Sequence, residues 1–215
     1  MPAPLEIAFS APAGPRLAGL FWRAPTTAPA VVIVPGLGSR KENHMDMGGA
    51  LAAAGLAALA IDVRGHGASA GRLDGGSVDD VRAALDWLAA RGHRSLGLRG
   101  SSMGALLALV GGDDPRVGAV VAICTARPAA LARRLGDDWP RALSVEAAVR
   151  RPGVARFFLH ATGDRTVPWA HSFHLATLAP NPVRLRVAVG GDHGSLQHAP
   201  ERIDATVDFF REYLR

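Results

Sequence analysis

The sequence predicts an α/β fold with a mostly parallel eight-stranded sheet flanked by helices. Apolar runs of strand length alternate with segments of helix length, which is the pattern of a largely parallel sheet. Three runs are almost wholly apolar, as expected for central strands covered on both faces: 30–34, 119–123 and 156–159. The 215 residues, 48% hydrophobic and 20% charged, suit one globular domain spanning residues 1–215.

Each expected element follows from this alternation. The expected strands are 5–10, 17–23, 30–34, 56–62, 95–99, 117–123, 155–161 and 183–189. The expected helices are 43–54, 77–91, 103–111, 169–178 and 201–214. The first two strands are less apolar and lie next to prolines, so we expect them to form an antiparallel edge. Ser77 is the expected N-cap of its helix because acidic residues follow it in the first turn.

One segment, at about 125–152, departs from the alternation. It has weak helical periodicity and Arg-Pro and Trp-Pro breaks, so it is predicted to be an insertion between two strands. Arginines outnumber acidic residues between positions 127 and 156. There are seven arginines (127, 133, 134, 141, 150, 151 and 156) and three acidic residues, Asp137, Asp138 and Glu146. The simpler interpretation is a solvated face. The alternative is a basic wall that faces a substrate.

Composition excludes several classes of protein. The net charge is +5, from 24 basic and 19 acidic residues, but the arginines are spread among acids without an aromatic-interleaved stripe, so we expect no nucleic-acid partner. The single cysteine, Cys124, excludes an internal disulfide framework and is expected to be an inert core thiol. No apolar stretch is long enough to span a membrane, and the N-terminus lacks a secretory pattern. We therefore expect a cytoplasmic protein.

A candidate nucleophile lies between a strand and an apolar helix. Gly100-Ser101-Ser102-Met103-Gly104 has the pattern G-x-S-x-G, with Ser102 at its centre. In this context the sharp turn exposes the central serine, and the helix N-terminus favours negative charge. The pattern predicts Ser102 as the nucleophile and leaves Ser101 as its nearest competitor.

A serine hydroxyl needs a base, and the base needs a group that orients it. Asp164 and His193 each follow a predicted strand, as Ser102 does, and catalytic groups of open α/β sheets gather at the carboxyl ends of strands. Asp192 competes with Asp164, but its side chain should point away from the neighbouring histidine. His198 competes with His193, but it lies just before the last helix. The expected triad is Ser102, His193 and Asp164.

At this point the chain resembles the α/β-hydrolase superfamily, in particular its serine esterase and lipase-like members with a short cap. The order Ser…Asp…His is that of these hydrolases. Residues 62–69 resemble their D-x-R-G-H-G-x-S turn, and residues 34–38 resemble their oxyanion loop, with Pro35 where the family usually has histidine. The resemblance implies an oxyanion hole formed by the backbone N–H groups of Leu37 and Met103. It also implies that the insertion at about 125–152 is a short cap, which leaves a fairly open cleft.

The sequence therefore predicts a serine hydrolase without a cofactor or metal, which cleaves small-molecule carboxylic esters, or thioesters or lactones, through an acyl-enzyme. His171 and His174 are spaced to share a metal on a helix, but no third ligand is spaced to join them. Neither the natural substrate nor the oligomeric state follows from these patterns.

Two alternatives remain open. Gly65–Ala70 fits the dinucleotide-binding pattern G-x-G-x-x-A after a strand, which would suit an oxidoreductase. Against it, the next helix begins only at about Ser77, and the expected acidic residue is missing. The second alternative is a catalytically silent binding protein on the same fold, because a fold does not dictate function.

Overall fold

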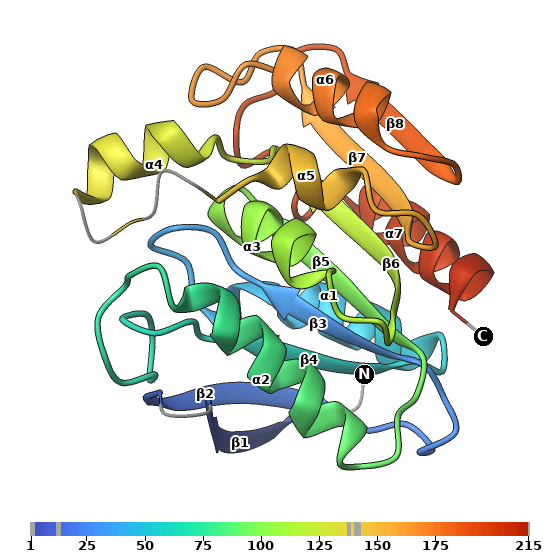
Figure 1. Cartoon of the computed structure of the whole chain (residues 1–215). Coiled ribbons are helices and arrows are strands. Elements are labelled where there is room, and N and C mark those ends of the chain that lie inside the picture. Colours follow the sequence, from blue (N-terminus) through green and yellow to red (C-terminus); the bar gives the residue numbers. More distant parts are fainter. Residues whose placement is uncertain (1–2, 12–13, 137–138, 140–142, 215) are drawn as a thin grey trace.

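The computed structural model describes residues 3–11, 14–136, 139 and 143–214. Its strands form one sheet with the order β1-β2-β4-β3-β5-β6-β7-β8 (Figure 1). The strands are β1 (Leu5–Ser10), β2 (Arg16–Trp22), β3 (Ala30–Val34), β4 (Ala57–Ile61), β5 (Leu96–Ser101), β6 (Val117–Ile123), β7 (Ala155–Ala161) and β8 (Val183–Ala188). β1 and β2 pair antiparallel with each other and β2 with β4, whereas the other pairs are parallel. The predicted sheet and its antiparallel edge are confirmed.

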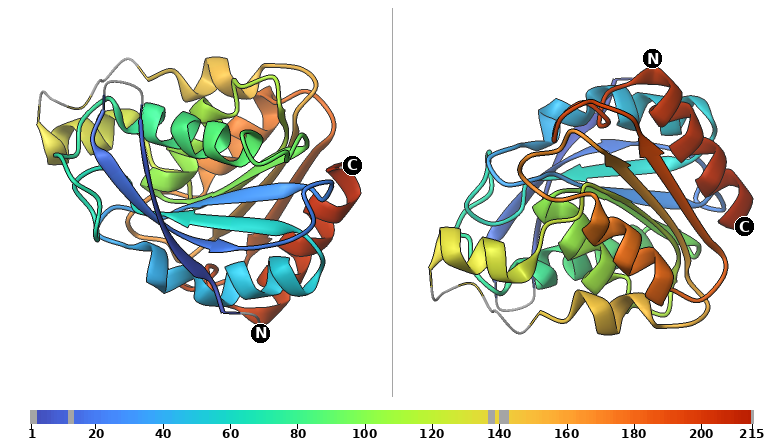
Figure 2. Two further views of the ribbon diagram at one scale, coloured as in Figure 1. Left: turned by 90° about the horizontal axis from the view of Figure 1, so that it is seen from below. Right: turned by 90° about the horizontal axis from the view of Figure 1, so that it is seen from above.

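Helices cover both faces of this sheet. They are α1 (Met45–Ala53), preceded by a 3₁₀ turn (Lys41–His44), α2 (Ser77–Ala89), α3 (Met103–Gly111), α4 (Pro128–Leu135), α5 (Val145–Val149), α6 (Ala170–Leu178) and α7 (Pro200–Tyr213). Two of them, α1 and α7, lie on one face, and the others lie on the opposite face (Figure 2). Among the described residues, no helix is long and apolar enough to cross a membrane.

The central strands are apolar because both of their faces are buried. Along β3, Val31 and Ile33 pack in the layer beneath α1 and α7, whereas Val32 and Val34 pack in the layer beneath α2 and α3. Successive strand residues point to opposite faces, so a strand covered on both sides has no polar alternation. The sheet is thereby held rigid, and its carboxyl edge becomes a firm platform for loops.

One sequence-based expectation about a helix start is wrong, and the predicted insertion between two strands is more helical than its weak periodicity indicated. Ser77 is not an N-cap: it is the first residue of α2, and its hydroxyl donates to the Asp74 carbonyl at 2.8 Å. The insertion at 125–152 contains α4 and α5. The Arg-Pro pair starts α4 instead of breaking a helix, because proline is tolerated in the first helical turn, where its missing N–H needs no partner. Asp137, Asp138 and Arg141 of the arginine-rich segment lie outside the described residues.

A buried arginine links the strand before Ser102 to the loop after β8. Arg99 on β5 is fully buried, and it donates to His44 Nδ1 and to the Gln197 carbonyl, each at 3.1 Å. Burial lowers the pKa of Arg99 to about 10, which still leaves it charged at neutral pH. Burial and the nearby charge of Arg99 lower the pKa of His44 to about 3, so His44 stays neutral and accepts from the guanidinium.

This neutral histidine makes folding stability depend on pH. Between about pH 6.5 and pH 3, His44 is protonated in the unfolded chain but stays neutral in the folded protein. The contribution of His44 to the free energy of unfolding therefore falls as the pH falls. In His44→Asn, an amide oxygen can replace the Nδ1 acceptor without titrating. We expect the free energy of unfolding, measured by urea denaturation between about pH 7 and pH 5, to decline less steeply in this variant than in the wild type. Equal slopes would contradict the prediction.

Candidate active site

Ser102 lies in a sharp turn between β5 and α3. Its backbone has φ 54° and ψ −116°, an unusual conformation for a residue other than glycine. The flanking glycines are required by close packing: a Cβ at Gly100 would lie 2.1 Å from the Gly104 carbonyl oxygen, and one at Gly104 would lie 2.1 Å from that of Val34. The turn is closed by the Ser102 N–H, which donates to the Ile123 carbonyl at 2.8 Å. This is the strand-turn-helix that the G-x-S-x-G pattern predicts.

The structure brings Ser102, His193 and Asp164 together from three loops. His193 Nε2 lies 2.8 Å from Ser102 Oγ, and His193 Nδ1 lies 2.7 Å from Asp164 Oδ2. The His193 side chain is 25% exposed and the Asp164 side chain is fully buried, so the imidazole faces the solvent side and the carboxylate faces the interior. The Ser101 hydroxyl is buried and has no partner among the described residues. Of the two serines, Ser102 is the one whose hydroxyl contacts His193.

The Asp164 carboxylate accepts four hydrogen bonds. Its Oδ1 accepts from the backbone N–H groups of Thr166 and Val167, and its Oδ2 accepts from His193 and from His160. Burial by itself would raise the pKa of Asp164, but the hydrogen bonds from Val167 and His193 outweigh it and hold the pKa below its usual value. The carboxylate is therefore ionised at neutral pH. His160 was not anticipated, although it lies only four residues before Asp164.

The two competing residues are directed elsewhere. Asp192 Oδ1 accepts from the backbone N–H groups of Gly194 and Ser195, each at 2.9 Å, so this carboxylate caps its own turn. His198 Nδ1 lies 2.8 Å from Asp46 Oδ2, and the His198 ring stacks on His44 beneath the sheet. The structure therefore places His193, with Asp164, next to Ser102.

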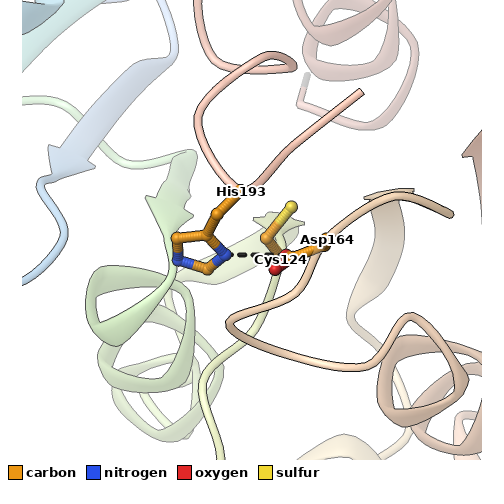
Figure 3. Close-up of side chains that lie close together, drawn as sticks. All are labelled: Cys124, Asp164 and His193. Carbon is orange, nitrogen blue, oxygen red and sulfur yellow. Dashed lines mark hydrogen bonds and ion pairs between the residues drawn. The ribbon is translucent and has the colours of Figure 1, made fainter. Parts of the chain in front are cut away.

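Cys124 was expected to be an inert core thiol, but it lies next to Asp164 and His193. It is buried at the end of β6, and its Sγ and the nearest ligand atoms of Asp164 and His193 all lie within 4.8 Å of one another (Figure 3). Burial, together with the charge of Asp164, raises the pKa of the Cys124 thiol to about 12. The thiol is thus protonated at neutral pH, and His193 Nδ1 and Asp164 Oδ2 already bond to each other. This arrangement fits a base with its orienting acid, and we assign no metal to it.

The loop after β3 lies against the nucleophile turn. A Cβ at Gly36 would lie 3.2 Å from the Ser101 carbonyl oxygen and 3.4 Å from Ser102 Cβ, so glycine permits the approach. The two expected oxyanion donors are the N–H of Leu37, the residue after Gly36, and the N–H of Met103, the residue after Ser102 at the start of α3. The Gly38 N–H donates to His66 Nε2 at 3.0 Å, so a histidine from another loop supports this loop where Pro35 replaces the family's usual histidine.

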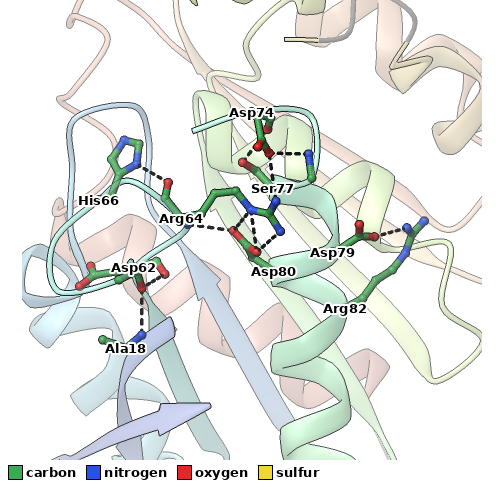
Figure 4. A network of polar contacts seen from close by, with 11 residues as sticks. Ala18, Asp62, Arg64, His66, Asp74, Ser77, Asp79, Asp80 and Arg82 are labelled. Carbon is green, nitrogen blue, oxygen red and sulfur yellow. Dashed lines mark hydrogen bonds and ion pairs between the residues drawn. The ribbon is translucent and has the colours of Figure 1, made fainter. Parts of the chain in front are cut away.

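The turn that carries His66 is itself fixed by buried charge. Arg64 binds Asp80 through its backbone N–H, Nε and Nη2, with distances of 2.7–3.1 Å (Figure 4). Asp62 accepts from the backbone N–H and Nζ of Lys41 and from the Ala68 N–H. Within this turn the Ala68 N–H donates to the Asp62 carboxylate, and the next helix, α2, does not begin until Ser77. This geometry does not suit the phosphate cradle of a dinucleotide site.

One cavity borders the candidate triad. It has a volume of about 450 Å³ and is lined by His193 together with Arg165 and Asp192. A second cavity, of about 660 Å³, lies between α4, α5 and α6, and Arg127 and Arg133 are among its lining residues. None of the three candidate triad residues lines this second cavity, but Arg127 follows Ala126, whose N–H donates to the Ser102 carbonyl at 3.1 Å. Part of the arginine-rich segment therefore lines a cavity, and the chain leads from there to a contact with the turn at Ser102.

The fold resembles that of several solved hydrolases. An α/β-hydrolase from Penicillium sp. sh18 is 16% identical and superposes with a TM-score of 0.84 over 100% of this chain and 99% of that chain. The esterase domain of a Rhodothermus marinus protein is 21% identical, with a TM-score of 0.80 over 98% of each chain. An esterase from Pyrococcus furiosus is 18% identical, with a TM-score of 0.81 over 99% of this chain and 92% of that chain. At these identities the similarity shows the α/β-hydrolase fold.

Sequence comparison adds the family. No curated protein sequence matches the chain significantly. The family model for serine aminopeptidase, S33, matches residues 25–143, more than half of the chain. The matched region contains the loop after β3 and the nucleophile turn, and it ends before Asp164 and His193. With an eight-stranded α/β sheet and a serine at the nucleophile turn, the chain belongs to the S33 serine aminopeptidase family of α/β-hydrolases.

Proposed function

We propose that this protein is a serine hydrolase that cleaves carboxylic esters, including thioesters or lactones, through an acyl-enzyme. The observation that carries the proposal is the continuous hydrogen-bonded path from Ser102 Oγ through His193 to Asp164, at 2.8 and 2.7 Å, starting from a strained and accessible turn. Similarity to proteins named as esterases supports the ester as the bond that is cleaved.

The geometry suits acylation. His193 Nδ1–H donates a hydrogen bond to the Asp164 carboxylate and keeps its proton, which leaves Nε2 free to accept from the Ser102 hydroxyl. Ser102 Oγ attacks the ester carbonyl while its proton passes to Nε2, and the ionised Asp164 stabilises the imidazolium that forms. The N–H groups of Leu37 and Met103 would then donate to the oxyanion, where preorganised donors contribute most.

Acylation ends as the tetrahedral intermediate collapses: the Nε2 proton passes to the departing alkoxide, the C–O bond breaks, and the alcohol leaves. Deacylation then repeats the sequence with water as the nucleophile. Water then attacks the acyl-enzyme as Nε2 accepts its proton, and Ser102 Oγ recovers a proton as the acid is released. Every proton transfer uses Nε2, so the mechanism needs no cofactor or metal.

We further propose that residues 1–215 act as one domain in which the segment at about 125–152 is a short cap. Its helix α5 packs against α3 and α6, and both α4 and α5 border the cavity of about 660 Å³ (Figure 1). A short cap cannot enclose a long chain, so small or medium acyl groups should be preferred over long lipid chains, without activation at an oil–water interface.

The central test combines a substrate panel with covalent labelling. We expect hydrolysis of p-nitrophenyl esters that declines as the acyl chain lengthens, and labelling of Ser102 by a fluorophosphonate. Ser102→Ala should abolish both, whereas the matched variant Ser101→Ala should keep both. An alanine p-nitroanilide in the same panel tests the peptidase activity that the family name suggests. A label on Ser101, or no label on folded protein, would end the proposal.

A second prediction concerns the acid. Asp164→Asn should lower kcat by about 10⁴, because an amide in place of the carboxylate favours the wrong imidazole tautomer and cannot stabilise the imidazolium. Asp192→Asn is the matched control, since that carboxylate is adjacent in sequence to His193 but caps its own turn. Steady-state kinetics of the two variants check the assignment. A near-normal rate in Asp164→Asn would assign the acid to another residue.

A third prediction concerns charge on the substrate. Arg127 and Arg133 line the cavity between α4, α5 and α6, and neither forms an ion pair within the described part of the chain. Esters that carry a carboxylate or phosphate should therefore show a kcat/KM about tenfold higher than matched neutral esters at low salt, and the advantage should shrink as salt rises. The double variant Arg127→Gln/Arg133→Gln should lose it. Equal rates for neutral and anionic esters would contradict this substrate preference.

A further inference from the structure

Two imidazoles share one oxygen of the Asp164 carboxylate. His193 Nδ1 lies 2.7 Å from Asp164 Oδ2, and His160 Nε2 lies 3.1 Å from the same atom. His160 is the residue before the end of β7, and its side chain is fully buried. The ester mechanism proposed above uses His193 and gives His160 no part.

The contacts of His160 determine where its proton lies. Its Nε2 faces two acceptors, Asp164 Oδ2 and the Val167 carbonyl at 3.0 Å, so Nε2 must carry a hydrogen. Its Nδ1 lies 2.7 Å from Ser172 Oγ on α6. Burial is the main reason that the pKa of His160 is below its usual value, which keeps the ring neutral. In the neutral ring Nδ1 then accepts from the Ser172 hydroxyl, and all three contacts are satisfied together.

We infer that His160 is a positioning residue for the reaction: by donating from Nε2 to Asp164 Oδ2, it holds that oxygen in place and tempers the negative charge that the carboxylate presents to His193. The inference rests on the proposed function, since it assigns Asp164 and His193 the roles of acid and base. His160 itself would not touch the substrate.

Two effects should follow from this second donor. The Oδ2 atom is held from two directions, so it cannot rotate away when His193 becomes charged during acylation. The Oδ2 atom also shares its charge between two donors, so it attracts the Nδ1 hydrogen of His193 less strongly than it would with one. Loss of the His160 donor should therefore lower kcat and move the acid limb of the kcat/KM profile to higher pH, because His193 would keep its proton to higher pH.

Among the described residues, the other charged or titratable groups near the pair include Arg165, which lines a cavity together with His193. The Cys124 thiol at the end of β6 lies against Asp164, and its raised pKa leaves it neutral. Asp192 in the loop after β8 contributes negative charge near Cys124, and His171 on α6 lies near His160. Burial and the charge of Arg127 lower the pKa of His171 to about 4, so His171 is neutral in the pH range of the acid limb.

The test uses His160→Phe, which keeps a ring and removes both nitrogens, and His160→Gln, whose amide can donate from near the Nε2 position. We expect His160→Phe to lower kcat about 10- to 100-fold, the value of one hydrogen bond to a charged group, with little change in KM and with the acid limb at higher pH. His160→Gln should retain much of the wild-type kcat and most of the wild-type position of the acid limb. The control is His93→Phe, since His93 is also buried but bonds the remote Ala28 carbonyl.

Destabilisation alone gives a different result. A loss of folded protein would lower activity without moving the acid limb, and titration of active sites with a fluorophosphonate corrects for it. If His160→Phe does not fold, Ser172→Ala takes its place, because it removes only the hydrogen bond to His160 Nδ1. This variant should shift the acid limb in the same direction as His160→Phe, but by less. A wild-type acid limb and kcat in His160→Phe, or equal impairment of the Phe and Gln variants without a shift, would overturn the inference.

A spectroscopic readout separates this inference from the proposed function. The His193 Nδ1–H bonded to a carboxylate should give a far-downfield proton resonance, and His160→Phe should move it without any substrate present. If the wild type hydrolyses no ester but this resonance moves as expected, the esterase proposal fails and the positioning contact stands. If esters are hydrolysed and the resonance and acid limb are both unchanged in His160→Phe, the inference fails and the esterase proposal stands.

Discussion

The strained backbone of Ser102 is the constraint on which the rest of the site depends. A φ of 54° at a residue with a side chain costs about 1–3 kcal/mol, and it persists only where the surroundings impose it. Here they do so from three sides: Gly100 and Gly104 pack backbone against backbone, the Ser102 N–H bonds to Ile123, and the wholly apolar start of α3 is buried. The result is a hydroxyl held at the carboxyl edge of the sheet, beside a helix N-terminus.

Buried carboxylates organise the loops around this hydroxyl. Asp164 and Asp62 are both saturated with donors, and each ties together parts of the chain that are distant in sequence. A buried carboxylate with several donors resists rotation, because every movement breaks a hydrogen bond. Asp164 thereby holds the His193 ring, and Asp62 holds the turn whose His66 supports the loop after β3.

The basic groups behave differently on the two sides of the sheet. Beneath it, Arg99 is fully buried without a contacting carboxylate among the described residues, and it bonds a neutral histidine and a carbonyl. Its role is to join β5, which leads into Ser102, to the loop that carries His193. Above the sheet, Arg127 and Arg133 line an open cavity. The first arginine is bonded within the fold, whereas the other two border the cavity between α4, α5 and α6.

Local sequence patterns are enough to predict the sheet, its antiparallel edge and the turn at Ser102, because these depend on apolar alternation and on glycines at fixed spacing. The same patterns make Asp164 and His193 candidates, since both follow strands. The packing of the folded chain was needed to show that Asp192 bonds within its own loop, that Cys124 lies against Asp164, and that His160 donates to the same oxygen as His193. These outcomes depend on side-chain directions at the ends of neighbouring strands, and on loops that meet only after the sheet has formed. No local pattern encodes that meeting.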